Sequence, residues 1–256
     1  MQLRRALPRG PVRRLLRRAR ATLKSPPALM MKLLPRSVVA RIKGRRELQF
    51  WTKWTRDHGI GPETEYYRRF MLAMGGISDE SVFVGKVCLD IGCGPMGSLT
   101  WLRNHAKAAI GLDPLANDYR SFGIGQHDMI YLNASAESIP LPDEYVDVLF
   151  CMNALDHVEN VRAACFEIRR ILKPGGWFIG SINLDEPPSW TEPWCLTESF
   201  LDLHLFRGWE REFWKVCPRL QSNEHFGPYK YMFEECPPAV LGARGPRALW
   251  CRFRKR

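Results

Sequence analysis

Short apolar segments alternate with segments of helical periodicity between residues 84 and 182. Apolar runs of this length are typical of buried parallel strands, and alternation of strand and helix implies a sheet covered on both faces. The pattern therefore predicts an α/β fold with a doubly wound, mostly parallel sheet. The predicted strands are Val87–Ile91, Ala108–Asp113, Met129–Leu132, Tyr145–Cys151 and Trp177–Gly180, and the clearest predicted helix is Val158–Leu172.

An aromatic-rich segment, residues 47–75, precedes the first predicted strand and has helical character. The sequence Gly59-Ile60-Gly61-Pro62 combines two strong helix breakers and should divide this segment into two helices. Its aromatic side chains would either cover a ligand pocket or pack against the edge of the sheet.

The first 46 residues contain no acidic side chain. Between Pro11 and Pro26 the apolar residues fall on one face of a helix and arginines fill the rest. Such a basic amphipathic helix suits an anionic membrane surface or RNA phosphates. A solvated arm and an organellar transit peptide are the other interpretations. The apolar residues of this face are Val12, Leu15, Leu16, Ala19 and Leu23.

The first predicted strand leads directly into a glycine-rich turn, Gly92-Cys93-Gly94-Pro95-Met96-Gly97. Glycines let the backbone turn tightly and approach a ligand closely. Ser98 is placed to cap a helix after the turn, whose free N–H groups would face the ligand. Strand, glycine turn and helix together predict the nucleotide-binding corner of a doubly wound domain.

Two acidic residues narrow the ligand class. Asp90 lies two positions before the first glycine, where its charge would repel a pyrophosphate but attract an ammonium group such as that of S-adenosylmethionine. Asp113 ends the second predicted strand, and an acid there can accept hydrogen bonds from both ribose hydroxyls. A dinucleotide oxidoreductase stays open as an alternative, because Gly92, Gly94 and Gly97 also satisfy the Gly-x-Gly-x-x-Gly pattern.

Composition changes this picture at the ends of the chain. The formal net charge is +11, yet residues 1–50 carry 15 Lys and Arg with one acid, and residues 51–243 carry 17 bases and 26 acids. The central part is therefore mildly acidic, and the high overall charge does not predict a basic site. Eight cysteines without a Cys-x-x-Cys pair are typical of a reduced cytoplasmic protein, and no metal-ligand spacing is evident. We therefore expect no metal.

Five motifs in this order resemble those of class I S-adenosylmethionine-dependent methyltransferases of the type 11 kind, in particular bacterial small-molecule and surface-glycan methyltransferases. The resemblance covers about residues 84–182 and continues more weakly to 256. The motifs are Leu89–Gly94, Gly111–Asp113, Ala136–Pro140, Tyr145–Val148 with Leu155–Val158, and Leu172–Gly176.

The resemblance implies roles for individual residues. Gly92 and Gly94 would approach the methionine and ribose portions of S-adenosylmethionine, Asp90 would help hold its ammonium group, and Asp113 would bind the ribose hydroxyls.

On the adenine side, Ala136 would offer backbone polarity to the base with Glu137 nearby, and Asn153 would lie by the methionine moiety. Ser135 departs from the family, in which an aspartate at this position often bonds the adenine amino group. A hydroxyl accepts that bond more weakly than a carboxylate.

The resemblance also implies the Rossmann-like methyltransferase fold, with seven strands and a reversed last strand. Trp209–Val216 and Ala248–Phe253 are the candidates for the final hairpin. The predicted organisation is a basic, partly helical arm (1–46) and a methyltransferase domain (47–256). Within the domain we expect a helical lid (47–82), a cofactor-binding core (83–182), and a substrate wall with the final hairpin (183–256).

For an oxygen acceptor the reaction needs a group that removes a proton. His157 follows the fourth predicted strand and is the first candidate for this base; packing at the start of the next helix is the alternative interpretation of this residue. Glu192, His204 and His58 are further candidates for the base. Asp156 would orient His157 or cap that helix, and we favour the cap.

The sequence thus predicts a cytoplasmic S-adenosylmethionine-dependent methyltransferase acting on a small molecule or glycan by O-methylation. Its arm could contact the inner face of an anionic membrane. An RNA methyltransferase using the arm, and a binding protein that keeps the fold without catalysis, are the alternatives; the absence of an Asn/Asp-Pro-Pro-Tyr/Phe sequence after strand four disfavours nucleic acid.

Overall fold

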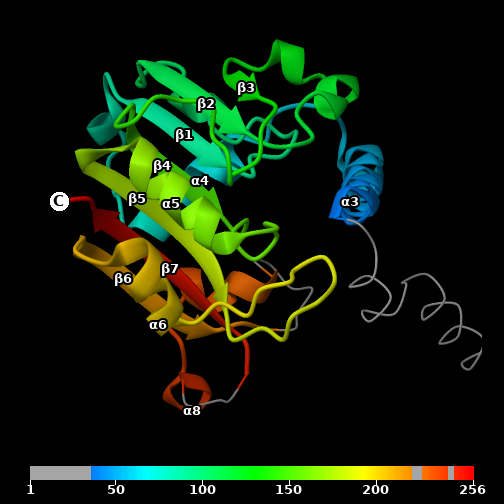
Figure 1. Cartoon of the computed structure of the whole chain (residues 1–256). Helices are drawn as coiled ribbons and strands as arrows, with labels where there is room; N and C mark the ends of the chain where they lie inside the picture. Colours follow the sequence, from blue (N-terminus) through cyan, green and yellow to red (C-terminus); the bar gives the residue numbers. More distant parts are fainter. Residues whose placement is uncertain (1–35, 221–226, 242–244) are drawn as a thin grey trace, which may run out of the picture. The chain divides into compact units, whose positions relative to one another are not determined.

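The computed structural model describes residues 36–220, 227–241 and 245–256 (Figure 1). The amphipathic helix predicted within residues 12–24 lies outside these ranges. By compactness the chain divides into residues 1–45 and residues 46–256, and the fold described below is that of the second unit. Helix α3, Arg36–His58, runs across this division.

A seven-stranded sheet forms the centre of this unit, with the order β3-β2-β1-β4-β5-β7-β6 (Figure 1). Neighbouring strands are parallel, except that β7 runs antiparallel to both β5 and β6. The predicted fold class, with its reversed last strand, is therefore confirmed. The strands are β1 Val87–Ile91, β2 Ala108–Leu112, β3 Ile130–Leu132, β4 Val146–Met152, β5 Leu172–Leu184, β6 Glu210–Pro218 and β7 Arg247–Arg254.

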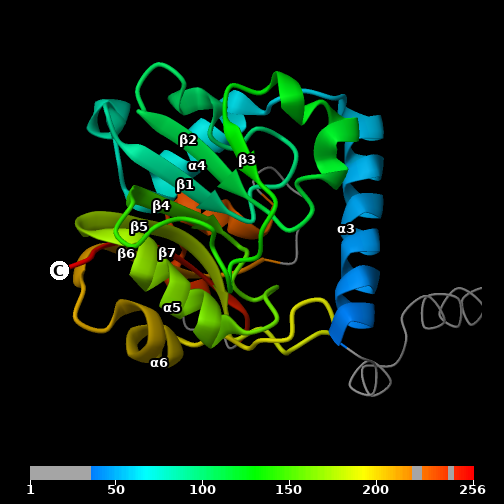
Figure 2. The ribbon, with the colours of Figure 1, turned by 45° about the horizontal axis from the view of Figure 1, so that its top comes forward.

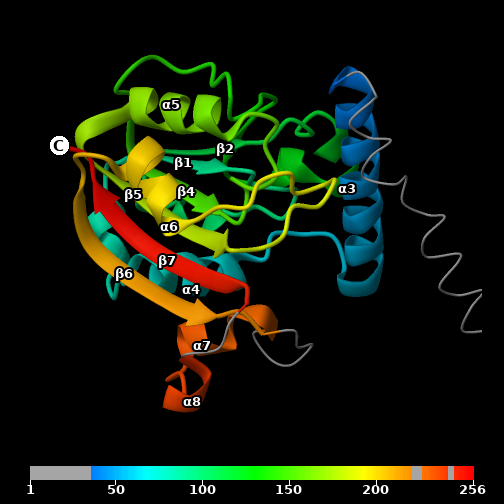
Figure 3. The same cartoon turned by 60° about the horizontal axis from the view of Figure 1, so that its bottom comes forward.

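Helices cover both faces of the sheet. Helix α4, Thr64–Gly75, and helix α5, Val161–Ile171, lie on opposite sides of it (Figures 2 and 3). Strand β1 is buried throughout because its side chains alternate between the two layers: Leu89 belongs to the core cluster on the α5 side and Cys88 to the cluster on the α4 side. This two-sided burial explains why the strand is apolar at almost every position.

The other helical segments are short. The α-helices are α6 Glu198–Leu201, α7 Lys230–Phe233 and α8 Pro238–Leu241. The 3₁₀ segments are η1 Glu80–Phe83, η2 Thr100–Leu102, η3 Asp118–Phe122, η4 Ile124–Gln126 and η6 Gly227–Tyr229, and Asp202–Phe206 (η5) forms a π-helix.

The prediction of a helix directly after the glycine turn is wrong. Only the short segment η2 forms there, and Ser98 caps nothing: its hydroxyl is buried and makes no hydrogen bond among the described residues. The Thr100 hydroxyl donates to Gly97 O at 2.8 Å, and the Trp101 indole donates to Ser98 O at 3.0 Å. Side-chain donors thus bond two of the first carbonyls that a helix would use, and compete with its main-chain hydrogen bonds.

Two predicted boundaries near α5 also change. The helix begins at Val161 rather than Val158, and its cap is Asn160, whose side chain accepts from Ala163 N at 3.2 Å. The proposed cap by Asp156 is therefore wrong. Strand β5 is longer than predicted because Gly175 N donates to Lys255 O at 2.7 Å, which pairs the predicted Pro-Gly-Gly stop with the end of the chain.

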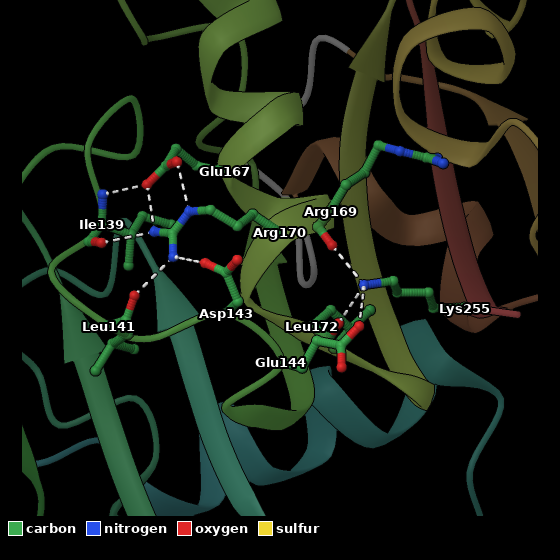
Figure 4. A network of polar contacts seen from close by, with 9 residues as sticks. All are labelled: Ile139, Leu141, Asp143, Glu144, Glu167, Arg169, Arg170, Leu172 and Lys255. Carbon is green, nitrogen blue, oxygen red and sulfur yellow. Dashed lines mark hydrogen bonds and ion pairs between the residues drawn. The ribbon is translucent and has the colours of Figure 1, made fainter.

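Arg170 on α5 fixes the loop that follows β3 (Figure 4). Its guanidinium donates to Ile139 O at 2.9 Å and to Leu141 O at 2.8 Å, and it pairs with Asp143 and Glu167. Nearby, Lys255 Nζ donates to Arg169 O at 2.7 Å and to Leu172 O at 2.6 Å. These bonds satisfy carbonyls at the end of α5 and hold the loop and the chain end against it.

Candidate active site

The glycine turn lies at the carboxyl end of β1, where it contacts two other segments. Gly92 and Gly94 have φ values of 71° and 57°, the left-handed region that favours glycine. A Cβ at Gly92 would lie 2.5 Å from Ala154 Cβ, and one at Gly94 would lie 2.9 Å from the Trp51 indole. The turn therefore requires glycine at these two positions for its conformation and for its close contacts.

Asp90 and Asp113 lie on adjacent strands beside this turn. Asp90 is 2% exposed, and its Oδ1 accepts no hydrogen bond from any described residue. Asp113, 7% exposed, accepts from Leu115 N at 2.9 Å through Oδ1 and from Gly94 N at 3.2 Å through Oδ2. The structure thus brings the two predicted cofactor carboxylates together at one edge of the sheet.

The surroundings of these carboxylates disfavour their charged forms. Burial raises the pKa of Asp90 to about 7, against a smaller lowering by Ser98 and with a further rise from Asp113. Burial likewise raises the pKa of Asp113 to about 6, although the N–H groups of Leu115 and Gly94 oppose the shift. A cationic ligand group beside Asp90 would supply the countercharge that no described residue is seen to provide.

The affinity for S-adenosylhomocysteine is expected to rise about tenfold between pH 5.5 and pH 7.5. Its ammonium group pairs with the ionised form of Asp90, which becomes the main form only near pH 7. The free energy of unfolding of the ligand-free protein should change in the opposite direction. Both pKa values are raised above the unfolded value of about 4, so this free energy falls as pH rises from about 4 to about 7. Calorimetric titration across this range measures the affinity, and the Asp90→Asn variant should lose most of the dependence. An affinity that falls with pH would contradict the role of Asp90.

The loop after β3 is tied to the start of α5 by Glu137. The Ser135 hydroxyl donates to Glu137, whose Oε1 accepts from Glu159 N at 2.7 Å and from Asn160 N at 3.1 Å. Ala136 between them is 5% exposed. Glu137 therefore joins two loops at the ligand edge of the sheet, and the adenine contacts of Ser135, Ala136 and Glu137 stay predictions.

The loop after β4 carries the remaining predicted residues. Asn153 has a positive φ of 53°, and its Oδ1 is buried without a hydrogen-bond partner among the described residues. Asp156 is 3% exposed, whereas the His157 side chain is 41% exposed. His157 Nε2 lies 3.8 Å from Asp156 Oδ1 and 3.7 Å from Glu192 Oε1. The structure thus places Asp156 and His157 together, with a carboxylate from a distant segment.

Sequence reasoning did not single out two aromatic residues that flank the turn. Trp51 on α3 lies against Gly94, and its indole Nε1 is buried without a partner in the described ranges. Tyr67 on α4 is 5% exposed; burial raises the pKa of its hydroxyl, and Asp90 and Glu63 raise it further. The aromatic composition of residues 47–75 was compatible with covering a ligand pocket or with packing against the edge of the sheet, and one sequence does not show which ring meets the turn.

Within residues 36–220, 227–241 and 245–256, no group of three or more His, Cys, Asp or Glu side chains is arranged to hold a metal ion. In the same ranges, no helix combines the length and the hydropathy that a membrane span requires.

Comparison with known proteins assigns the class that this fold and turn define. Residues 89–180 match a family model described as a methyltransferase domain. Residues 89–180 therefore form a methyltransferase domain, in agreement with the motifs, which predicted a class I S-adenosylmethionine-dependent methyltransferase with S-adenosylmethionine as its cofactor.

Two curated relatives illustrate the match. A sterol 4-C-methyltransferase of Caenorhabditis elegans is 30% identical over 99 residues, which cover 36% of this chain and 29% of that protein. A fatty-acid O-methyltransferase of Mycolicibacterium smegmatis is 24% identical over 176 residues, covering 59% and 63%. The chain thus spans less than two thirds of the length of these curated relatives.

A solved S-adenosylmethionine dependent methyltransferase of Mesorhizobium loti shares the fold. Its TM-score is 0.52 at 19% identity, with 73% of this chain and 96% of that chain covered.

Proposed function

We propose that the protein transfers a methyl group from S-adenosylmethionine to a hydroxyl group of a small molecule or glycan. The observation that carries the proposal is the pair Asp90 and Asp113, two buried carboxylates beside a glycine turn with no cation among the described residues hydrogen-bonded to either. This arrangement suits a ligand with an amine and a diol and disfavours a pyrophosphate.

Three buried polar atoms support the fit of S-adenosylmethionine. Asp90 Oδ1 and Asn153 Oδ1 are acceptors without partners in the described residues, and Trp51 Nε1 is a donor without one. Buried polar groups ordinarily have hydrogen-bond partners. The methionine portion offers an ammonium group and a carboxylate, which supply both kinds of partner. When bound, S-adenosylmethionine supplies a methyl group activated by the positive charge on its sulfur.

The residues of this chain would hold the acceptor, exclude water and accept a proton. Transfer to an oxygen needs the acceptor and the methyl group in line. The loops after β4 and β5 follow the carboxyl ends of these strands, where open α/β sheets form their binding crevices. The similarity to a fatty-acid O-methyltransferase is compatible with an oxygen acceptor, and the similarity to a sterol methyltransferase with a small molecule.

Two measurements test the proposed function separately. Calorimetric titration of the full chain with S-adenosylhomocysteine is expected to show binding to one site. Incubation with tritiated S-adenosylmethionine and a mixture of hydroxyl and carboxylate acceptors is expected to give a methylated product that is stable to mild alkali, as an ether is and an ester is not. Lack of S-adenosylhomocysteine binding contradicts the cofactor site; binding with an alkali-labile product contradicts the hydroxyl acceptor.

A further inference from the structure

The structure buries the Asp156 carboxylate, which was not predicted from the sequence. Its side chain is 5% exposed, and Oδ2 accepts no hydrogen bond from any described residue, while Oδ1 faces His157 Nε2 at 3.8 Å. Since Asn160 caps helix α5, capping does not explain why a carboxylate is buried here. A buried carboxylate oxygen without a donor needs one from elsewhere, and a bound hydroxyl group is such a donor.

His157 Nε2 lies near two carboxylates, those of Asp156 and Glu192. Glu192 Oε1 lies 3.7 Å from His157 Nε2. A tight turn positions Glu192: its backbone N–H donates to Ser189 Oγ at 3.0 Å, and Ser189 Oγ donates to Glu192 Oε2 at 3.3 Å. Trp194 Nε1 donates to Val158 O at 2.9 Å and fixes the same segment to the loop that carries His157. The imidazole is thus placed to balance carboxylate charge.

The groups next to Asp156 make the region acidic. Tyr229 donates to Asn183 Oδ1 at 3.2 Å, and Asn183 Nδ2 donates to Glu186 Oε2 at 3.4 Å. Arg219 pairs with Glu186. The titratable groups that interact with Asp156 are His157 on its own loop, Glu186 and Glu192 on the loop after β5, Tyr229 on η6 and Cys151 on β4.

We propose that Asp156, rather than His157, accepts the proton of the acceptor, and that the acceptor group is an uncharged hydroxyl and not a carboxylate. This inference rests on the proposed function. In the transfer the acceptor O–H bond breaks and its proton goes to Asp156 Oδ2. The acceptor oxygen bonds to the methyl carbon, and the sulfur–methyl bond breaks with its electron pair left on sulfur.

Charge and acidity both support this assignment. Burial raises the pKa of Asp156 to about 6, against a lowering by His157. A base with a pKa close to the working pH is efficient, because it is ionised before transfer and still basic enough to hold the proton. A carboxylate acceptor has no proton to give at neutral pH, and Asp156 and Glu192 would repel it. His157 then acts as a positioning residue that keeps Asp156 ionised.

The test compares two panels of acceptors with full-length protein. The hydroxyl panel contains octyl β-D-glucoside, dodecan-1-ol and cholesterol, and the carboxylate panel contains octanoate, palmitate and benzoate. Transfer is expected to the hydroxyl panel alone. Asp156→Asn should lower that transfer about 100-fold and His157→Gln less than tenfold. The exposed Asp118→Asn serves as the matched control and should change nothing.

Two readouts separate a chemical role from a structural one. S-adenosylhomocysteine should bind Asp156→Asn and the unmodified protein equally within about twofold, which shows an intact cofactor site. With S-adenosylmethionine at saturating concentration at every pH, the rate of the unmodified protein should rise with pH around pH 6, and that of Asp156→Asn should not. Calorimetry with the best hydroxyl acceptor, in the presence of S-adenosylhomocysteine, should show about tenfold weaker binding by Asp156→Asn.

Three outcomes overturn the assignment: transfer to the carboxylate panel, a loss in His157→Gln as large as that in Asp156→Asn, or transfer to neither panel by protein that binds S-adenosylhomocysteine. Failure of the proposed cofactor site is recognised separately, because S-adenosylhomocysteine then does not bind.

Discussion

Replacing Gly92 with alanine is expected to lower the free energy of unfolding by about 3 kcal/mol and to abolish S-adenosylhomocysteine binding. Two costs combine. A non-glycine residue at a φ of 71° costs about 1–2 kcal/mol, and forcing a methyl group into a closely packed site costs about 1–3 kcal/mol. The second cost arises because the new Cβ would lie 2.5 Å from Ala154 Cβ, on the loop that leads to Asp156. Urea denaturation and calorimetry measure the two effects.

The chain offers a matched control for this substitution. Gly85 has the same φ of 71°, and a Cβ there meets no atom within 4 Å. Gly85→Ala should therefore show the backbone cost alone, about 1–2 kcal/mol, and leave ligand binding unchanged. Combining Gly92→Ala with Ala154→Gly should recover part of the lost stability. Equal destabilisation by the two single substitutions would show that the contact with Ala154 is unimportant.

Asp113→Asn is expected to weaken S-adenosylhomocysteine binding about 100-fold. The carboxylate accepts from Leu115 N and Gly94 N, and the proposed ribose hydroxyls would add further donors to the same two oxygens. An asparagine keeps the size, but one of its two positions becomes an N–H₂ group that cannot accept. Charge-assisted bonds contribute about 1.5–3 kcal/mol each, so the loss of one or two gives this factor.

Adenine and homocysteine serve as the probes that locate the effect of Asp113→Asn. Neither contains a ribose, so the variant should change their weak binding little, as judged by saturation-transfer NMR. Asp118→Asn, on the exposed start of η3, is the control for charge. An affinity for S-adenosylhomocysteine within threefold of the unmodified protein would contradict the ribose assignment.

The sheet was predictable because its strands are buried on both faces. Val87–Ile91 was predicted with the bounds that β1 has, and the break at Gly59–Pro62 separates α3 from α4 as expected. The helix after the glycine turn was not predictable from periodicity. Its apolar spacing is helical, but Thr100 and Trp101 bond local carbonyls in its place.

The parts of the site that could be predicted are those whose positions follow from the order of the strands along the chain. Asp90 and Asp113 come together because parallel strands end at one edge of a sheet. The approach of Glu192 to His157 depends on a turn about 35 residues further along the chain, and no periodicity signals such a contact. Trp51 reaches Gly94 from a helix that precedes the sheet altogether. Contacts between segments that are distant in the sequence could therefore be identified only from the structure.

The position of β7 has a consequence for synthesis of the protein. This strand separates β5 from β6, and among the described strands β6 pairs with β7 alone. While the nascent chain is still on the ribosome, β1 to β5 can pair in order, but β6 has no partner among these strands until β7 has left the exit tunnel. The half of the sheet that carries the cofactor edge can thus form before β7 is available, whereas the remaining edge closes only once β7 has emerged.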